Sequence, residues 1–166
     1  MIALHDFNHL PHEKALALIH PCVALPGWAD ALVRGRPYAS RDELFDTANA
    51  LTQNWDEAAL AQALSAHPRI GEKPAGSQAE AALSRQEQGA VNEGDAALAR
   101  ALREGNARYE ARFGRVFLIR AKGRSGEAIL QALTRRLQHT ADEEVTEALA
   151  QLREITMLRL EGAIGE

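Results

Sequence analysis

The residues best suited to chemistry lie in the stretch Ala66-His67-Pro68-Arg69-Ile70-Gly71-Glu72-Lys73. Proline disfavours the α conformation in the residue before it, so a helix that reaches this stretch is expected to stop at His67. A free imidazole has a pKa of about 6.5, which suits proton transfer near neutral pH. A histidine at the end of a helix can also serve only to interact with the last carbonyl groups. His67 is therefore either an acid and base in a cleft or a helix-ending residue.

A second polar cluster, Ser84-Arg85-Gln86-Glu87-Gln88, begins with the pattern of a helix capping box. Ser77-Gln78-Ala79-Glu80 has the same pattern shortly before it, which predicts a short helix followed by a second one. A cap only satisfies backbone N–H groups. The free N–H groups of a helix start also favour anions, so these residues can form the wall of a site, with Glu87 and Gln88 over the same cleft as His67. The two interpretations are compatible.

Arg159 lies in the middle of an apolar stripe of the last predicted helix. At about 100° per residue, this stripe is formed by Val145, Ala148, Leu149, Leu152, Ile155, Thr156 and Ala163. A guanidinium group keeps its proton in proteins, so in apolar surroundings it needs an anionic partner. That partner is either a carboxylate of this chain or one of a ligand, and the spacing leaves both open.

Capping patterns and apolar periodicity predict the helices that position these residues. Leu60, Ala63, Leu64 and His67 recur at i, i+3, i+4 and i+7, so His67 is predicted to continue the inward face of a helix. The predicted helix starts are Pro11, Trp28, Ser40, Asn54, Asp95, Ser125 and Thr140.

The run Val116-Phe117-Leu118-Ile119 is the only β-like segment, and it is too short and too isolated to make a sheet. It predicts a buried, extended connector. Since its backbone groups lack strand partners, some near Ile119 to Ala121 are expected to remain free to bind a polar group. Together with the helices, this predicts an all-α fold, a single-domain bundle of about eight helices that covers residues 1–166.

Composition narrows the classes of function. The formal charge is −4 and the 19 basic residues are scattered, which argues against nucleic acid as a partner. No apolar run approaches the roughly 20 residues that span a bilayer, and the start of the chain lacks the basic residues of a signal peptide. Cys22 is the only cysteine, which fits a reducing, cytoplasmic compartment. His5, His9 and His12 have a metal-like spacing, but Pro11 interrupts any helix carrying all three, so we expect no metal site.

Four motifs in register make the chain resemble a known family. They are His67-Pro68-Arg69-Ile70-Gly71, Ser84-x-x-Glu87-Gln88, Asn106-x-x-Tyr109-x-x-x-Phe113-Gly114 and Ile155-x-x-Leu158-Arg159-Leu160. The sequence resembles the 2-oxo-4-hydroxy-4-carboxy-5-ureidoimidazoline (OHCU) decarboxylases, which complete the conversion of urate to (S)-allantoin. The resemblance implies an all-α enzyme, usually a homodimer, that acts on a small molecule with no metal or organic cofactor.

Position by position, the resemblance also implies roles for single residues. His67 matches the catalytic histidine and Glu87 matches its carboxylate partner, while Arg159 matches an arginine that binds an anionic group of the substrate. The residues that match the substrate-binding wall are Pro68, Ser84, Arg85, Gln86, Gln88, Ile119, Arg120 and Ala121.

The chain departs from the family pattern at the connector. Arg115-Val116 stands where members often have an aromatic residue and proline, and Arg120 and Lys122 make the segment more basic. If the side chain of Arg120 points inward, we expect the substrate to be oriented differently from the substrate of other family members. Two alternatives remain at this point: a helical binding module without catalysis, and the same scaffold acting on a related ureido or imidazolone acid.

Overall fold

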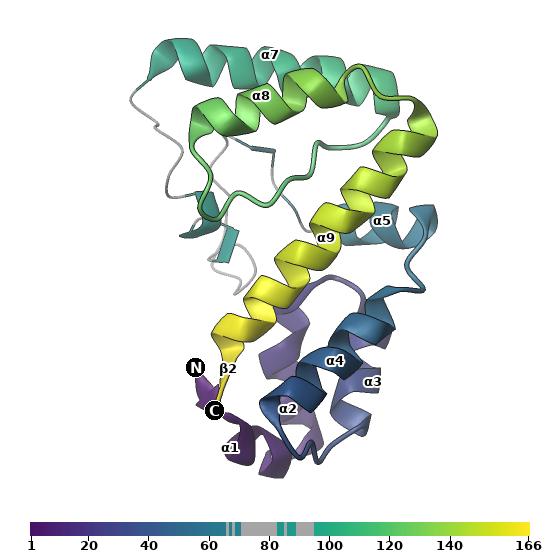
Figure 1. Ribbon diagram of the computed structural model, residues 1–166, viewed down its shortest axis with the longest axis vertical. Coiled ribbons are helices and arrows are strands. Elements are labelled where there is room, and N and C mark those ends of the chain that lie inside the picture. Colours follow the sequence, from purple (N-terminus) through teal and green to yellow (C-terminus); the bar gives the residue numbers. More distant parts are fainter. Residues whose placement is uncertain (66, 68, 71–82, 85, 89–94) are drawn as a thin grey trace. The chain divides into compact units, whose positions relative to one another are not determined.

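The structure is a computed structural model that describes residues 1–65, 67, 69–70, 83–84, 86–88 and 95–166. In this part of the chain helices dominate, which confirms the predicted all-α class (Figure 1). The helices are α1 (Leu4–His9), α2 (His12–Ile19), the 3₁₀ helix η1 (His20–Cys22), α3 (Pro26–Arg34), α4 (Arg41–Thr52), α5 (Glu57–Leu64), α7 (Ala96–Phe113), α8 (Gly126–Arg136) and α9 (Ala141–Ala163). None of these helices is both long and apolar enough to span a bilayer.

The chain forms two compact units, residues 1–63 with 153–166 and residues 64–152. We describe each unit by itself. The single domain expected over residues 1–166 stays a prediction.

Four helices begin at the predicted residues. The side chains of Ser40, Asp95, Ser125 and Thr140 each accept a hydrogen bond from the backbone N–H three residues further on, at 3.0 to 3.1 Å for the first three and 3.2 Å for Thr140. The N–H of Thr140 in turn donates to Glu143 at 2.9 Å, which completes a capping box at the start of α9. These four predicted starts are confirmed.

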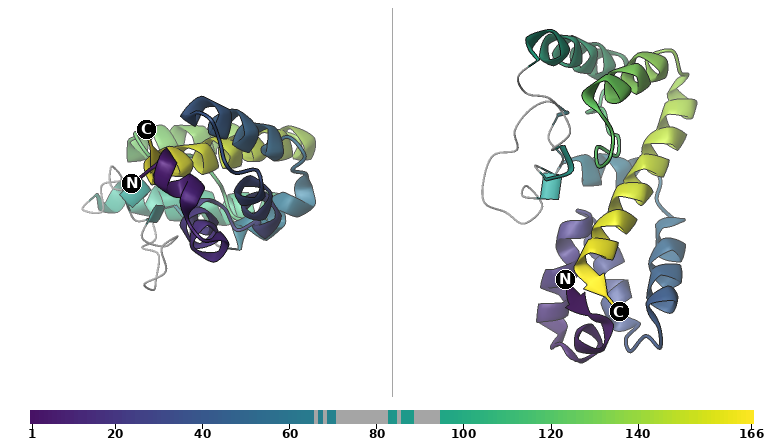
Figure 2. Two further views of the ribbon diagram at one scale, coloured as in Figure 1. Left: turned by 90° about the horizontal axis from the view of Figure 1, so that it is seen from below. Right: turned by 60° about the vertical axis from the view of Figure 1, so that its left-hand side comes forward.

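The first unit contains a pairing that the sequence did not predict. Strands β1 (Ile2–Ala3) and β2 (Ile164–Gly165) pair in parallel, so the two ends of the chain lie side by side (Figures 1 and 2). Arg41 at the start of α4 donates to the carbonyl of Ile164 at 2.9 Å and holds the C-terminal strand. Strands of two residues show no alternation of apolar and polar side chains, so no sequence pattern indicates them.

The core of the first unit joins helices that follow one another along the chain. The indole N–H of Trp28 on α3 donates to the carbonyl of Ala48 on α4 at 3.0 Å, and this bond is buried. Five apolar side chains of this unit have no exposed surface: Phe7, Ile19, Leu32, Leu44 and Leu160. The predicted helix near Trp28 begins two residues earlier, at Pro26, because proline is tolerated in the first turn.

The second unit is built on the close approach of α7 and α8, which lie side by side in both views (Figures 1 and 2). Gly105 of α7 lies against the side chain of Leu133 on α8, and Gly126 of α8 lies against Leu98 on α7. A side chain at either glycine would meet the end of the opposing leucine, so the two glycines allow this packing. Helix α7 ends as expected at Gly114, which has the positive φ of 72° that glycine adopts readily.

A buried ion pair fixes the connector between α7 and α8. The guanidinium of Arg136 on α8 contacts the carboxylate of Glu144 on α9 at 2.6 Å, and both side chains are fully buried. Arg136 also donates to the carbonyl of Leu118 in the connector at 2.7 Å. Tyr109 of α7 donates to Glu144 at 2.5 Å, and burial, together with this bond, raises the pKa of the Tyr109 phenol. Three helices and the connector therefore meet at one carboxylate.

We predict that Glu144→Gln lowers the free energy of unfolding by about 3 to 5 kcal/mol, because it removes the buried partner of Arg136 and leaves only the more distant carboxylate of Glu147, at 4.0 Å. Urea denaturation at neutral pH measures the loss. The matched control is Glu147→Gln on the same helix, which breaks a partly exposed ion pair with Arg135 and is expected to cost about 0 to 1 kcal/mol. Equal losses of unfolding free energy in the two variants would contradict the claim that the buried ion pair of Glu144 stabilises the fold more than the partly exposed pair of Glu147.

Candidate active site

His67 lies just beyond the end of a helix. Helix α5 ends at Leu64, and the backbone N–H of His67 donates to the carbonyl of Leu64 at 3.1 Å. The prediction that the helix stops before the proline is confirmed, whereas the prediction that His67 continues the helical face is wrong, since the residue no longer belongs to the helix. The residue is half-buried and its Nε2 atom is shielded from solvent.

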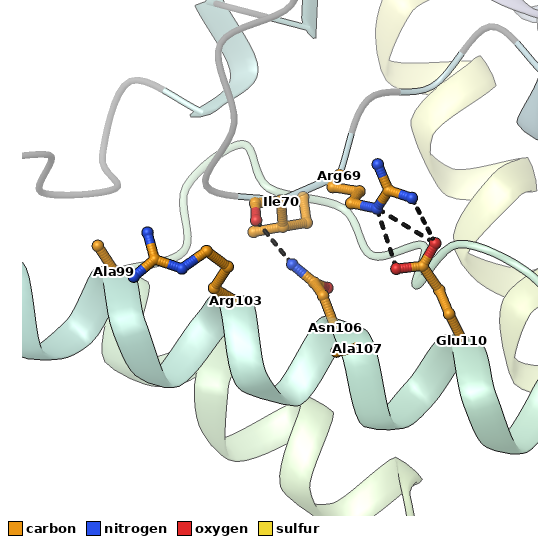
Figure 3. A pocket seen from close by; sticks show the side chains of 7 residues that line it. All are labelled: Arg69, Ile70, Ala99, Arg103, Asn106, Ala107 and Glu110. Carbon is orange, nitrogen blue, oxygen red and sulfur yellow. Dashed lines mark hydrogen bonds and ion pairs between the residues drawn. The ribbon is translucent and has the colours of Figure 1, made fainter.

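The residues that follow His67 are attached to α7. Asn106 donates its side-chain N–H to the carbonyl of Ile70 at 2.9 Å, and the guanidinium of Arg69 pairs with both carboxylate oxygens of Glu110 at 2.9 to 3.1 Å (Figure 3). A cavity of about 330 Å³ lies between this segment and the helix; it is lined by Arg69, Ile70, Ala99, Arg103, Asn106, Ala107 and Glu110. Pro68 lies outside the described residues.

The cluster around Glu87 is helical, but it does not begin where the sequence predicted. Leu83 and Ser84 are both helical, and Ser84 is 3% exposed. Ser84 therefore does not precede the helix as a cap, and that prediction is wrong. Gln86 is exposed, whereas Glu87 and Gln88 are half-buried. Arg85 and the predicted cap at Ser77 to Glu80 lie outside the described residues.

The connector is buried and extended, as predicted. Ile119 and Ala121 are 4% and 6% exposed. Its backbone is less available than expected, because the N–H of Arg120 donates to the side chain of Gln151 at 2.8 Å and the carbonyl of Ala121 accepts from the N–H of Arg124 at 3.1 Å. The expectation of free backbone groups is wrong at these two atoms. A glutamine on α9 supplies the acceptor that a neighbouring strand would have provided.

Arg159 belongs to the first unit, and its burial confirms the predicted stripe. The residue is 4% exposed, and its Nη1 atom donates to the carbonyl of Pro21 at 3.2 Å. This carbonyl is neutral, so the contact satisfies a donor of Arg159 without balancing its charge.

One cluster in the second unit has ligand types that suit a metal. His139, Glu144 and Glu147 bring their ligand atoms within 4.8 Å of one another. Their carboxylates are, however, already engaged by guanidinium groups: Arg136 contacts Glu144 at 2.6 Å and Arg135 contacts Glu147 at 2.7 Å. The hydrogen bond from Arg135 also lowers the pKa of Glu147. The cluster is therefore an ion-pair network.

Sequence reasoning gave no role to three residues that organise the second unit: Asn106, Arg136 and Gln151. A signal existed for Asn106, since it stands four residues after Leu102 on α7 and is buried with it. A polar residue on an apolar face indicates a buried hydrogen bond. Arg136 and Gln151 gave no such signal, because each bonds to a backbone group of the distant connector, Arg136 in addition to its ion pair with Glu144.

Comparison with known proteins identifies the family. The family described as OHCU decarboxylase matches residues 8–161. The chain belongs to the OHCU decarboxylase family. This membership makes the protein a decarboxylase and confirms the family that its motifs predicted.

Curated relatives agree with this membership. The chain is 27% identical to the 2-oxo-4-hydroxy-4-carboxy-5-ureidoimidazoline decarboxylase of Haloferax volcanii over 160 residues, which cover 96% of this chain and 94% of that protein. It is 33% identical over 127 residues to the uric acid degradation bifunctional protein TTL of Arabidopsis thaliana, covering 74% of this chain and 37% of that protein. It also matches the bifunctional protein PucL of Bacillus subtilis at 25% identity, over 100% of this chain and 33% of that protein.

Two solved structures have the same fold. An OHCU decarboxylase crystallised in the presence of (S)-allantoin has a TM-score of 0.72 and 25% identity, over 88% of this chain and 96% of that chain. An (S)-allantoin synthase has a TM-score of 0.74 over 99% of this chain and 54% of that chain; its identity of 19% supports the fold alone.

Proposed function

We propose that this OHCU decarboxylase converts OHCU to (S)-allantoin, the last step from urate to allantoin, and that His67 transfers the proton. The observation that carries the proposal is the position of His67. It stands outside the helix, half-buried, within the family match, and its neighbours Arg69 and Ile70 are attached to α7.

The chemistry needs little from the protein besides orientation and proton transfer. The carboxylate of OHCU is on a carbon that also bears a hydroxyl and adjoins a C=N bond. When carbon dioxide leaves, the bonding electrons flow into the ring, the ring nitrogen gains a proton, and an enol remains. The enol then loses its O–H proton while the neighbouring carbon gains one, which sets the configuration of allantoin. The substrate thus provides the electron sink for which many decarboxylases use a cofactor.

His67 has the chemistry for the proton transfers. In this proposal its imidazole accepts the proton of the substrate hydroxyl and delivers a proton to one face of the ring, while Glu87 aligns the imidazole. Glu87 is half-buried in the same unit. Holding the base on one side of the substrate is what makes the product a single enantiomer.

The proposed substrate wall follows the residues that match the family. Since Gln151 already accepts from the N–H of Arg120, we propose that the connector contacts the substrate through its other groups. The wall consists of Pro68, Ser84, Arg85, Gln86, Gln88, Ile119, Arg120 and Ala121. We further propose that Arg159 binds an anionic group of the substrate, because a guanidinium makes strong, charge-assisted hydrogen bonds to a carboxylate.

We also propose that the protein acts as a homodimer in the cytoplasm. Met157 and Leu158 lie off the apolar stripe of α9 and are half-buried in the single chain, so a second subunit has apolar surface to cover. A single cysteine that is buried and forms no disulfide suits a reducing compartment.

His67→Asn is expected to lower kcat for OHCU by about 100-fold or more, because general acid and base catalysis contributes about 10² to 10⁴. The unfolding midpoint should stay close to that of the wild type. The loss of OHCU absorbance, corrected for spontaneous decay, measures the rate.

The matched control is His12→Asn, which changes an exposed histidine on α2 that faces Asp30. It should leave kcat unchanged. A near-normal kcat in folded His67→Asn would contradict the proposed role of His67.

Arg159→Leu is expected to raise KM about tenfold or more with little change in unfolding free energy, since a hydrogen bond to a charged group contributes about 1.5 to 3 kcal/mol. The control is Arg153→Leu, which removes another guanidinium of α9 that donates to a backbone carbonyl, that of Thr52 at 3.2 Å. Steady-state kinetics and urea denaturation are measured on both. Severe unfolding of Arg159→Leu with an unchanged KM in the folded fraction would show that Arg159 is a structural residue.

A further inference from the structure

The chain from His67 to Ile70 meets α7 through polar contacts. Asn106 donates to the carbonyl of Ile70, and Glu110 accepts from the guanidinium of Arg69. Asn106 and Glu110 are four residues apart, so they lie on one face of the helix, and Figure 3 shows both side chains reaching toward the same segment. Two neighbouring residues of the catalytic segment are thus held by one helical face.

The two contacts differ in burial and therefore in importance. The side chains of Arg69 and Glu110 are 49% and 26% exposed, so water screens their ion pair. Asn106 is 4% exposed and its bond to Ile70 is buried. If this bond is removed, the Ile70 carbonyl loses a partner that water does not readily replace. The bond from Asn106 is the stronger constraint of the two.

The cavity beneath the segment increases this dependence. It has a volume of about 330 Å³ and separates part of the segment from α7. Where close packing would hold two elements together, the empty space contributes no contacts. Asn106 and Glu110 therefore supply the polar part of the attachment between the segment and the helix, beside the apolar packing of Ile70.

The segment has two further attachments, one to the end of α5 and one to the apolar face of α7. The backbone N–H of His67 donates to the carbonyl of Leu64, which is 7% exposed at the end of α5. Ile70 packs into the cluster that contains Leu98, Leu102 and Tyr109. Between these two attachments the imidazole has little freedom to move with the backbone.

We propose that Asn106 is a positioning residue, which sets the place of the His67 imidazole through its bond to the Ile70 carbonyl. The inference rests on the proposed function, in which His67 transfers the proton. Asn106 does not touch the substrate. It acts by limiting displacement of the imidazole, and a misplacement of about 1 Å can cost about 100-fold in rate.

Three variants test this inference: Asn106→Ala, the isosteric Asn106→Asp, and the double variant His67→Asn with Asn106→Ala. In Asn106→Asp an acceptor replaces the donor, so the bond is lost without a change in size. Each single variant should lower kcat for OHCU about 10- to 100-fold, with KM within about twofold. If Asn106 acts only through His67, the double variant is no slower than His67→Asn alone.

The matched control is Arg103→Gln. Arg103 lines the same cavity on the same helix, but it makes no hydrogen bond or ion pair with the described residues. It should keep kcat within about twofold. All rates are expressed per folded protein, determined from the unfolding curve of each variant, so that a loss of stability does not appear as a loss of rate.

A second readout does not depend on the reaction. The imidazole ¹⁵N signals of His67, assigned from their absence in His67→Asn, should shift in Asn106→Asp and stay in place in Arg103→Gln.

A wild-type protein that does not decarboxylate OHCU would end the proposed function, and shifted signals would still support positioning by Asn106. Normal kcat in both folded Asn106 variants, an additive loss in the double variant, or unmoved His67 signals would overturn the inference.

Discussion

The second unit depends on the requirement that a buried charge be paired. Arg136 and Glu144 have no exposed side-chain surface, and each is costly to bury without the other. Around their contact, Tyr109 is fixed on α7 and the carbonyl of Leu118 is fixed in the connector. One ion pair thus sets the mutual arrangement of α7, α8, the first part of α9 and the connector that carries Ile119 and Ala121.

The same helix transmits this constraint to the catalytic segment. Tyr109, which contacts Glu144, stands between Asn106 and Glu110, which hold Ile70 and Arg69. Because the phenol of Tyr109 fixes α7 at that point, the two attachments of the segment start from a rigid base. In the proposed function His67 transfers a proton, which requires a defined distance from the substrate, so we infer that the buried ion pair acts on this step only through the position of the segment.

What the sequence predicted well depends on contacts between near neighbours. The caps at Ser40, Asp95, Ser125 and Thr140 bond to N–H groups three residues away, so their patterns are sufficient. The helix stop before Pro68 follows from local sterics, and the burial of the connector follows from its apolar run. Four motifs in register, the one around His67 among them, were enough to predict the family, which the match over residues 8–161 confirmed.

What the sequence did not predict depends on partners far along the chain. Gln151 occupies the N–H of Arg120 from 31 residues away, and Arg136 reaches the carbonyl of Leu118 across 18. Ser84 matched a local capping pattern, yet Leu83 and Ser84 are both helical, so Ser84 does not stand at the N-cap position. The attachment of Ile70 to Asn106, 36 residues away, could only be seen once α7 and the segment were placed in three dimensions.

The central claim is that an imidazole of this chain directs protonation of the substrate to one face without help from a metal or an organic cofactor. The most direct test follows the optical activity of the product when the purified protein, kept in a metal chelator, converts fresh OHCU. Our account predicts rapid formation of (S)-allantoin in a single enantiomeric form. Racemic allantoin, formed no faster than by the spontaneous decay of OHCU in buffer without the protein, would contradict it.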